Sequence, residues 1–255
     1  MINTKKNKAK LLSAKKKLTQ GFQAVFQPSK FYIYPRFEYS YHNLSFSQEG
    51  EDIILRRLFE EKKNTGFYVD IGAHHPQRFS NTYLFYLKGW NGINIDPIPG
   101  KMELFNQLRS RDINLEFGIS QFGNSLTYYI FNEQALNTFS KEIADQRKAP
   151  YKVIQEKQVE TYTLAKVLEQ YLPPNQEIDF LSIDVEGLDE EVVKSNDWKK
   201  YRPHIILAEA LKTTSLEEAI NSPVALFLQQ EGYGLIAKAK NTLFFQNFGN
   251  FTSLC

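Results

Sequence analysis

The sequence predicts an α/β protein built on a mostly parallel, doubly wound sheet. The apolar run at residues 67–71 contains Asp70, and Gly72 follows it at a sharp turn. A second apolar run, at residues 92–96, ends in Asp96. A strand, a glycine turn, a crossover and a second strand with a terminal carboxylate are the parts with which such sheets build a nucleoside pocket.

Length and composition are those of one large domain with a small appendage. The 255 residues are 42% hydrophobic, which is enough for a substantial core. No apolar run approaches the roughly 20 residues of a membrane span, and no apolar stretch follows the first lysines as it would in a signal peptide. The single cysteine, Cys255, excludes a disulfide or a cysteine metal site within the chain and favours a cytoplasmic location.

The charge is divided unevenly along the chain. Residues 1–36 hold nine Lys or Arg and no acid, whereas the rest holds 22 basic and 29 acidic residues. An acidic body argues against a nucleic-acid partner. Residues 11–26 have the spacing of a basic amphipathic helix, which either packs on the domain or, as part of residues 1–26, contacts the inner face of an anionic membrane. We expect a basic tail and helix over residues 1–43 and the main domain over residues 44–255.

The first elements of the main domain follow from caps and apolar runs. Ser47 is expected to cap a helix whose first turn is acidic. A strand at 67–71 follows, then a crossover helix at 81–87 capped by Ser80 and a strand at 92–96. This is the alternation expected of a parallel sheet.

The middle of the chain continues the alternation and then departs from it. We expect a helix at 102–109, a strand at 113–120 and a further strand at 125–131. Residues 132–158 are polar and look irregular, which predicts an insertion over the site.

The last third of the chain returns to buried strands. A helix at 164–171 precedes strands at 178–185 and 205–209. Residues 233–237 and 242–245 then read as an antiparallel pair.

Acidic residues mark the ends of four predicted strands: Asp70, Asp96, Asp184 and Glu209. Ligands of open parallel sheets bind beyond the carboxyl ends of the strands, and a packed core has no use for unpaired carboxylates. The four acids therefore predict a binding site at this edge. Asp96 is placed to accept hydrogen bonds from both hydroxyls of a ribose.

The turn after the first strand separates two classes of cofactor. A dinucleotide fold needs glycines where this chain has His74 and Pro76, so a pyrophosphate would be poorly accommodated and NAD or FAD is disfavoured. S-adenosylmethionine carries no phosphate. Asp70 could bind its ammonium group, and an acidic pocket attracts its sulfonium.

Several long segments carry a family resemblance: SQEGED (47–52), FYVDIGAHHP (67–76), RFSNTY (78–83), KGWNGINIDP (88–97), NTFS (137–140), IDFLSIDVEGLDEEVV (178–193) and KYRPHIILAE (200–209). With them the chain resembles the FkbM-type methyltransferases, a branch of the S-adenosylmethionine-dependent Rossmann-like enzymes, over about residues 44–245. The resemblance implies a class I methyltransferase domain with a seven-stranded sheet whose last strand is antiparallel. It also implies O-methylation, commonly of a sugar or polyketide hydroxyl.

The resemblance also assigns contacts to the cofactor. It implies that Asp70, Gly72 and Ala73 cradle the methionine part and that Asp96 holds the ribose. The end of the third strand would flank adenine through Gly118, Ile119 and Ser120. The histidines of the first turn replace glycines of the general class pattern.

Four residues are candidates for the base that removes the acceptor proton: His74, His75, Asp184 and Glu186. The histidines could instead shape the turn or contact the cofactor, and the two acids could hold a sugar hydroxyl. Some related sugar methyltransferases use a divalent ion, for which Asp184 and Glu209 would be the ligands of a cation such as Mg²⁺.

The sequence therefore predicts a cytoplasmic S-adenosylmethionine-dependent O-methyltransferase that acts on a carbohydrate or glycoconjugate. One alternative is a nicotinamide-dependent oxidoreductase on a similar sheet, against which the missing glycines argue. A second is a non-catalytic nucleoside-binding module, against which the four strand-end acids argue.

Overall fold

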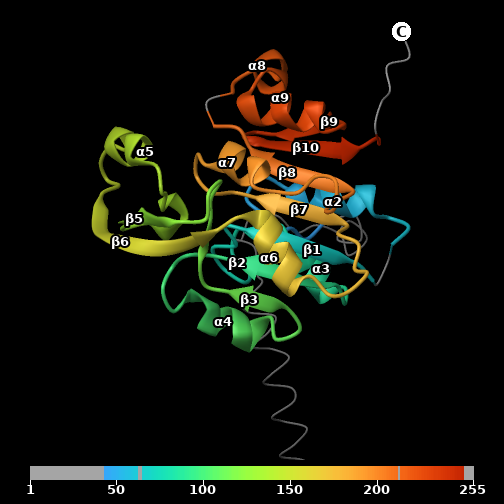
Figure 1. Ribbon diagram of the computed structural model, residues 1–255, viewed down its shortest axis with the longest axis horizontal. Helices are drawn as coiled ribbons and strands as arrows, with labels where there is room; N and C mark the ends of the chain where they lie inside the picture. Colours follow the sequence, from blue (N-terminus) through green and yellow to red (C-terminus); the bar gives the residue numbers. More distant parts are fainter. Residues whose placement is uncertain (1–42, 63–64, 212, 250–255) are drawn as a thin grey trace, which may run out of the picture. The chain divides into compact units, whose positions relative to one another are not determined.

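A seven-stranded sheet forms the centre of the protein (Figure 1). The structure is a computed structural model that describes residues 43–62, 65–211 and 213–249. The basic helix expected at residues 11–26 lies outside the described residues. Within the described part of the chain, every helix is too short or too polar to cross a bilayer.

The sheet has the strand order of a doubly wound fold: β3 (Ile113–Leu115), β2 (Asn91–Ile95), β1 (Phe67–Ile71), β7 (Phe180–Ile183), β8 (Ile205–Glu209), β10 (Thr242–Asn247) and β9 (Tyr233–Ala239). Strand β10 is antiparallel to both of its neighbours, and all other pairs are parallel. The predicted mostly parallel sheet with an antiparallel last strand is therefore confirmed. The chain changes direction across the sheet between β1 and β7, which is where such folds open a crevice.

Helices cover both faces of this sheet (Figure 1). Helices α6 (Leu164–Tyr171), α7 (Asp189–Lys194) and α9 (Pro223–Gln230) pack on one face, and α2 (Glu51–Leu58) and α3 (Tyr83–Leu87) pack on the other. Side chains alternate between faces along a strand. Val69 and Ile71 accordingly join the first core, and Tyr68 joins the second. Helix α4 (Lys101–Leu108) lies beside β3, and α8 (Leu216–Ile220) contacts α9.

A second, three-stranded sheet extends from the central one (Figure 1). It contains β4 (Gly118–Ile119), β6 (Val153–Tyr162) and β5 (Ser125–Phe131), and the segment between β5 and β6 forms a 3₁₀ helix (Gln134–Leu136) and α5 (Lys141–Gln146). The strand expected at 113–120 is therefore two strands in two sheets. The expectation of an irregular stretch at 132–158 was also wrong. Most of β6 is exposed and polar, so its backbone pairing with β5 forms it without an apolar pattern.

Two helices begin later than their predicted caps. Gly50, with φ 86°, precedes α2, and Ser47 instead accepts a 3.3 Å hydrogen bond from the Asp52 amide. The residue before α3 is Thr82, although the Ser80 hydroxyl still accepts a 3.1 Å hydrogen bond from the Tyr83 amide. Both serines thus bind the first turn from outside it. Helices α7, α8 and α9 had no counterpart among the predicted elements.

Candidate active site

The loop after β1 brings three strand ends together. Gly72 has φ 81°, and the amides of Gly72 and Ala73 donate to the Ile95 carbonyl at 2.9 and 3.1 Å. A Cβ atom at position 72 would lie 1.8 Å from the carbonyl oxygen of Asp184. Only glycine lets the backbone pass between the ends of β2 and β7 in this conformation.

A cavity of about 230 Å³ opens at this carboxyl edge. Among the residues predicted for the site, eight line it: Gly72, His74, Asp96, Gly118, Ile119, Asp184, Glu186 and Glu209. Four of the described residues that were predicted lie outside its lining: Asp70, Ala73, His75 and Ser120. The edge of the sheet is thus the site, but not every predicted side chain reaches it.

Asp96 is buried at the end of β2 and is fixed by the backbone. Its carboxylate accepts hydrogen bonds from the amides of His74 at 2.8 Å and Ile98 at 2.9 Å. Burial raises the pKa of Asp96 to about 6, and the two amides oppose that rise. Pro97, Phe117 and Ile119 supply apolar lining beside it. A carboxylate next to an apolar wall suits a ribose and its base.

The two histidines of the loop have different environments. Both ring nitrogens of His74 are buried and have no hydrogen-bond partner among the described residues. Burial, together with Lys101 and Arg78, lowers the pKa of His74 to about 4, so its ring is neutral at neutral pH. The His75 Nδ1 atom accepts hydrogen bonds from the amides of Gln77 and Arg78 at 3.1 and 3.0 Å. His75 therefore shapes the turn, whereas His74 faces the cavity.

Asp70 is not at the ligand edge, contrary to expectation. It pairs within the sheet with Asn94 and Ser182, and strand alternation turns its side chain toward the face that carries α3. There its carboxylate accepts a 2.8 Å hydrogen bond from the Thr82 hydroxyl. Burial raises the pKa of Asp70, and Thr82 and Arg109 oppose the rise.

Ala73 and Ser120 lie outside the cavity and contact the elements that surround it. Ala73 packs against Met102 and Phe105 of α4. The Ser120 hydroxyl lies 2.6 Å from that of Thr161, which ties β4 to β6. Neither side chain is placed to touch a ligand in the cavity.

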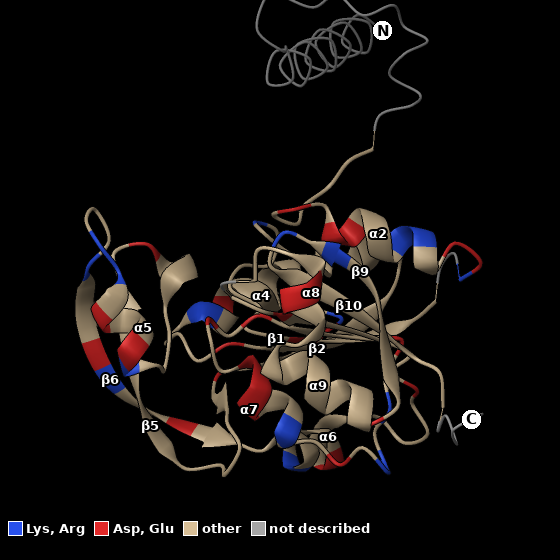
Figure 2. Cartoon of the chain, turned by 90° about the horizontal axis from the view of Figure 1, so that it is seen from above, with Lys and Arg blue, Asp and Glu red and all other residues tan. Residues whose placement is uncertain are grey.

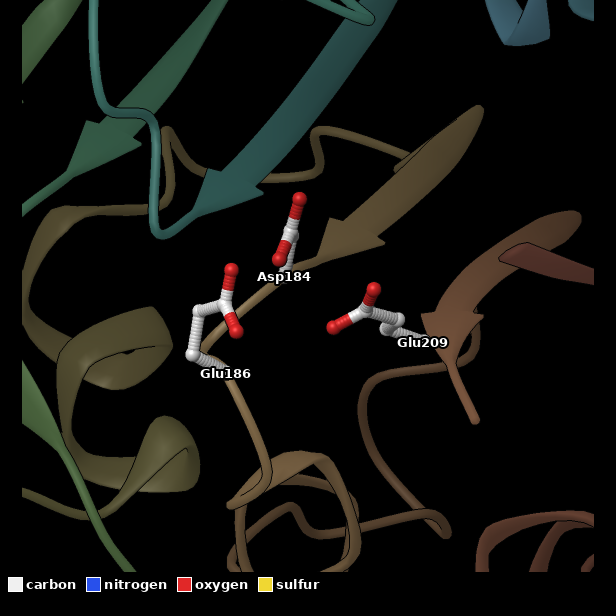
Figure 3. Close-up of side chains that lie close together, drawn as sticks. All are labelled: Asp184, Glu186 and Glu209. Carbon is white, nitrogen blue, oxygen red and sulfur yellow. The ribbon is translucent and has the colours of Figure 1, made fainter. Parts of the chain in front are cut away.

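Three carboxylates converge on the other side of the cavity (Figure 3). Asp184 follows β7, Glu186 lies two residues further, and Glu209 ends β8; one oxygen from each lies within 4.8 Å of the others. We call Asp184, Glu186 and Glu209 the acidic cluster. Asp184 is exposed to the cavity, although protein surrounds the cluster.

The acidic cluster has few compensating partners among the described residues. Arg147 forms an ion pair with Glu186. The Asn241 amide donates to one oxygen of Glu209 at 3.3 Å, and the other oxygen of Glu209 is buried without a hydrogen-bond partner. A buried carboxylate in this state is unfavourable unless a ligand, a proton or a cation completes it.

Protonation of the acidic cluster is one way to reduce the repulsion between its carboxylates. Burial, with Asp189 and Glu186, raises the pKa of Glu209 to about 8. Burial and the neighbouring Glu209 hold the pKa of Asp184 well above its ordinary value. Burial also raises the pKa of Asp189 to about 7. Like charges close together favour the protonated forms, as is common for acids and bases in active sites.

The residues at or beside the cavity that sequence reasoning missed include Phe79, Tyr128, Arg147 and Asp189. Asp189 opens α7, whose first turn is acidic (Figure 2), and its carboxylate accepts a 3.1 Å hydrogen bond from the Glu209 amide. The run of acids after Asp184 could have indicated it. Tyr128 and Arg147 come from β5 and from the segment after it, and the sequence predicts an insertion over the site at residues 132–158 without indicating which of its side chains reach the cavity.

The fold is a doubly wound α/β sheet with a candidate site at its carboxyl edge. The model of the methyltransferase FkbM domain matches residues 70–235, and the chain belongs to that family. Membership implies S-adenosylmethionine as the methyl donor.

Comparison with solved structures gives a further, weaker likeness. The precorrin-6y C5,15-methyltransferase of Geobacter metallireducens is 15% identical, with 80% of this chain and 88% of that chain covered and a TM-score of 0.37. A comparison with curated proteins found no match. Membership of the family therefore rests on the family model.

Proposed function

We propose that the protein transfers a methyl group from S-adenosylmethionine to a hydroxyl oxygen of a carbohydrate or glycoconjugate. The observation that carries this proposal is the acidic cluster, which borders the same cavity as Asp96. A cofactor held at Asp96 and an acceptor at the acidic cluster would meet in one site. Proton-accepting groups beside a hydroxyl are what O-methylation requires.

The residues of the cavity fit the methyl donor. Asp96 would accept hydrogen bonds from the ribose hydroxyls, and Ile119 and Phe117 would contact the adenine. The acidic cluster, with an unpartnered oxygen on Glu209, would attract a cationic group. When bound, S-adenosylmethionine supplies an electrophilic methyl group on a positively charged sulfur.

The protein itself would position the acceptor oxygen and supply a group that accepts its proton. Holding the acceptor oxygen in line supplies much of the rate. His74 is a weak base because its pKa is about 4. The carboxylates have raised pKa values, so their ionised forms are stronger bases near neutral pH. We assign the role of proton acceptor to Asp184, the member of the acidic cluster that is open to the cavity.

The same cluster also fits a divalent cation such as Mg²⁺. Asp184, Glu186 and Glu209 offer three carboxylate oxygens, and hard cations take oxygen ligands. Such a cation would neutralise the mutual repulsion and polarise a bound hydroxyl. Calorimetric titration of the protein with Mg²⁺ tests this directly. Binding that is lost in Glu209→Gln supports the site, and no binding to the wild type contradicts it.

Two experiments test the proposed reaction. Calorimetry with S-adenosylmethionine and with NAD separates a methyltransferase from an oxidoreductase, because only the first should bind. A glycan panel with methyl-labelled cofactor, with and without chelator, then identifies the acceptor. Tight NAD binding, or label on a nitrogen or carbon instead of an oxygen, would refute the proposal.

We also propose a cytoplasmic location, for which the single cysteine of the chain argues. Peripheral membrane contact through residues 1–26 is a separate proposal, supported by the nine basic residues of the first 36. Sedimentation with anionic vesicles should fall when residues 1–26 are deleted, while methyl transfer in solution is kept. Equal sedimentation of both forms would refute membrane contact.

A further inference from the structure

A buried amide side chain at the end of the 3₁₀ helix has one hydrogen-bonding group without a partner. Asn137 follows that helix, lines the cavity and is only 6% exposed. Its Oδ1 atom accepts a 2.8 Å hydrogen bond from the Phe131 amide. Its Nδ2 atom is buried and has no hydrogen-bond partner among the described residues. A buried donor in this state is unfavourable unless a ligand completes it.

The surroundings of Asn137 fix the direction of this donor. A backbone N–H group can only donate, so the Phe131 amide selects the side-chain oxygen and leaves the NH₂ group on the other side. The next residue, Thr138, exchanges two backbone hydrogen bonds with Tyr129, and its hydroxyl donates to the Glu186 carbonyl at 2.8 Å. The donor therefore has a fixed orientation on a fixed backbone.

Tyr128 is a polar neighbour of this donor but does not satisfy it. Burial and the nearby Asp96 hold the pKa of the Tyr128 hydroxyl well above its ordinary value, and Asn137 opposes that rise. The two side chains are thus close enough to sense each other, yet they make no hydrogen bond of ordinary length. The Nδ2 atom of Asn137 remains available for a ligand.

A series of contacts places Asn137 beside the wall proposed for adenine. The rings of Tyr128 and Phe139 pack at a centroid distance of 4.6 Å. The Phe139 ring in turn lies against Gly118, where an added Cβ atom would be 2.7 Å from it. Gly118 and its neighbour Ile119 line the cavity, as Asn137 does. The amide therefore lies at the end of the cavity that suits the base.

The side chains of this wall and Asn137 recognise different parts of a base. Pro97, Phe117, Ile119 and Phe139 offer apolar surface on which a base can stack, but their side chains carry no hydrogen-bonding atom. The ring nitrogens of adenine are acceptors, whereas its amino group is a donor. An NH₂ donor beside the apolar wall is therefore complementary to a ring nitrogen and not to the amino group.

We propose that Asn137 is a specificity-determining residue for the cofactor and that its Nδ2 atom donates a hydrogen bond to a ring nitrogen of the adenine. The proposal rests on the proposed function, because it takes S-adenosylmethionine as the ligand of the cavity. Recognition of the base then depends on the segment between β5 and α5 as well as on the central sheet.

Calorimetry with S-adenosylhomocysteine on the full chain tests this contact. Asn137→Asp keeps the size of the side chain and the acceptor for the Phe131 amide, but it replaces the donor by an oxygen. The control is Asn132→Asp, the same change on an exposed residue that lies before the 3₁₀ helix and outside the cavity lining. The Oδ1 atom of Asn132 likewise accepts a backbone hydrogen bond, from Lys152 at 2.9 Å.

We expect Asn137→Asp to weaken binding of S-adenosylhomocysteine about tenfold and Asn132→Asp to leave it within about twofold of the wild type. Binding of 5′-methylthioadenosine, which lacks the amino-acid end, should weaken by the same factor. Equal affinity of Asn137→Asp and the wild type would mean that the amide only supports its loop, and would overturn the proposal. A loss confined to S-adenosylhomocysteine would place the contact at the amino-acid end and overturn it as well.

Analogues of S-adenosylhomocysteine in which N1, N3 or N7 of adenine is replaced by C–H identify the acceptor atom. One of them should bind the wild type about tenfold more weakly than the parent compound, and that analogue and the parent should bind Asn137→Asp alike. Equal binding of all these ligands to the wild type contradicts the proposal, whether or not Asn137→Asp folds. So does a weakening that persists unchanged in Asn137→Asp.

The same titrations separate the two levels of inference. Binding of S-adenosylhomocysteine that does not depend on Asn137 refutes this contact alone. Failure of the wild type to bind any adenosyl ligand refutes the proposed function itself.

Discussion

Two groups of acidic side chains in the described part of the protein are compensated in opposite ways. One group is the acidic cluster. The other is a group on the face of the sheet that carries α3, which we call the Arg109 cluster: Tyr68, Asp70, Thr82, Asn94, Arg109 and Asp112. The first group contains a buried Glu209 oxygen without a hydrogen-bond partner among the described residues, whereas the second is held by many hydrogen bonds.

Arg109 is the centre of the second group. Its side chain and that of Asp112 are completely enclosed, and they form an ion pair at 2.8 Å. Arg109 also donates to the Tyr68 hydroxyl at 2.8 Å and to the Thr82 hydroxyl at 3.0 Å. Asp112 accepts further bonds from Tyr68 and from the Asn94 amide. Thr82 links this network to Asp70.

The difference shows what each group does. Buried charges persist in a scaffold when partners compensate them, as Arg109 and Asp112 do. Acids that lack such partners oppose folding and are typical of sites where a ligand completes them. Removing an acid from the two regions should therefore change stability in opposite directions.

The largest effect is expected from Asp112→Asn. It leaves the Arg109 charge buried without its counter-ion, so the free energy of unfolding should fall by about 3–5 kcal/mol. Urea denaturation measures this change. The double variant with Arg109→Met should recover part of the loss, because it removes the uncompensated charge. A loss under about 1 kcal/mol would mean that the Arg109 cluster does not support the scaffold.

Next, Asp184→Asn should reduce methyl transfer by about a hundredfold without lowering stability, because the base is lost while the repulsion is relieved. Initial rates with labelled cofactor and the acceptor found in the glycan panel measure the first effect, and thermal denaturation measures the second. A variant that is fully active would remove Asp184 from the reaction.

Asp96→Ala should weaken S-adenosylmethionine binding at least tenfold, because the ribose hydroxyls lose their charged acceptor. Calorimetry measures the change. Asp145→Ala is the control, since the Asp145 side chain is 64% exposed and lies outside the cavity. Equal affinity in wild type and Asp96→Ala would refute the ribose contact.

The smallest expected effect is an increase in stability. The pKa of Glu209 is about 8 in the folded protein and 4.5 as its ordinary value, so the folded state keeps a proton that the unfolded chain loses. This contribution to stability is present below about pH 4.5 and is lost as pH rises through about 8. Glu209→Gln should remove that loss and stabilise the protein by about 1 kcal/mol at pH 8. Denaturation at pH 5 and pH 8 checks it, and a variant that is less stable at pH 8 would contradict it.

Much of the central sheet could be predicted because parallel strands are buried on both faces. Such strands are nearly continuous apolar runs, and β1 and β8 were predicted with their observed bounds. The small sheet was not predictable in the same way. Strand β6 has mostly exposed, polar residues and depends on pairing with β5, a contact between distant segments.

The residues of the candidate site also differ in how far the sequence could predict them. Periodicity and strand ends alone located Asp96, Asp184 and Glu209 at the carboxyl edge, since the direction of a parallel strand fixes which end its last residue occupies. The same reasoning placed Asp70 there as well, and only the paired sheet shows that its side chain turns to the other face. Whether an acid near a strand end meets a ligand or a buried arginine depends on that alternation and on what packs above it.

The sequence by itself determined the fold class, the edge of the sheet that carries the site and the family, because each follows from local patterns and short motifs. Tertiary structure decided which acids share a site, that Arg109 compensates one group and not the other, and which side chains of distant segments line the cavity. These features join residues far apart in the chain, and burial and charge compensation are properties of such contacts and not of any one segment.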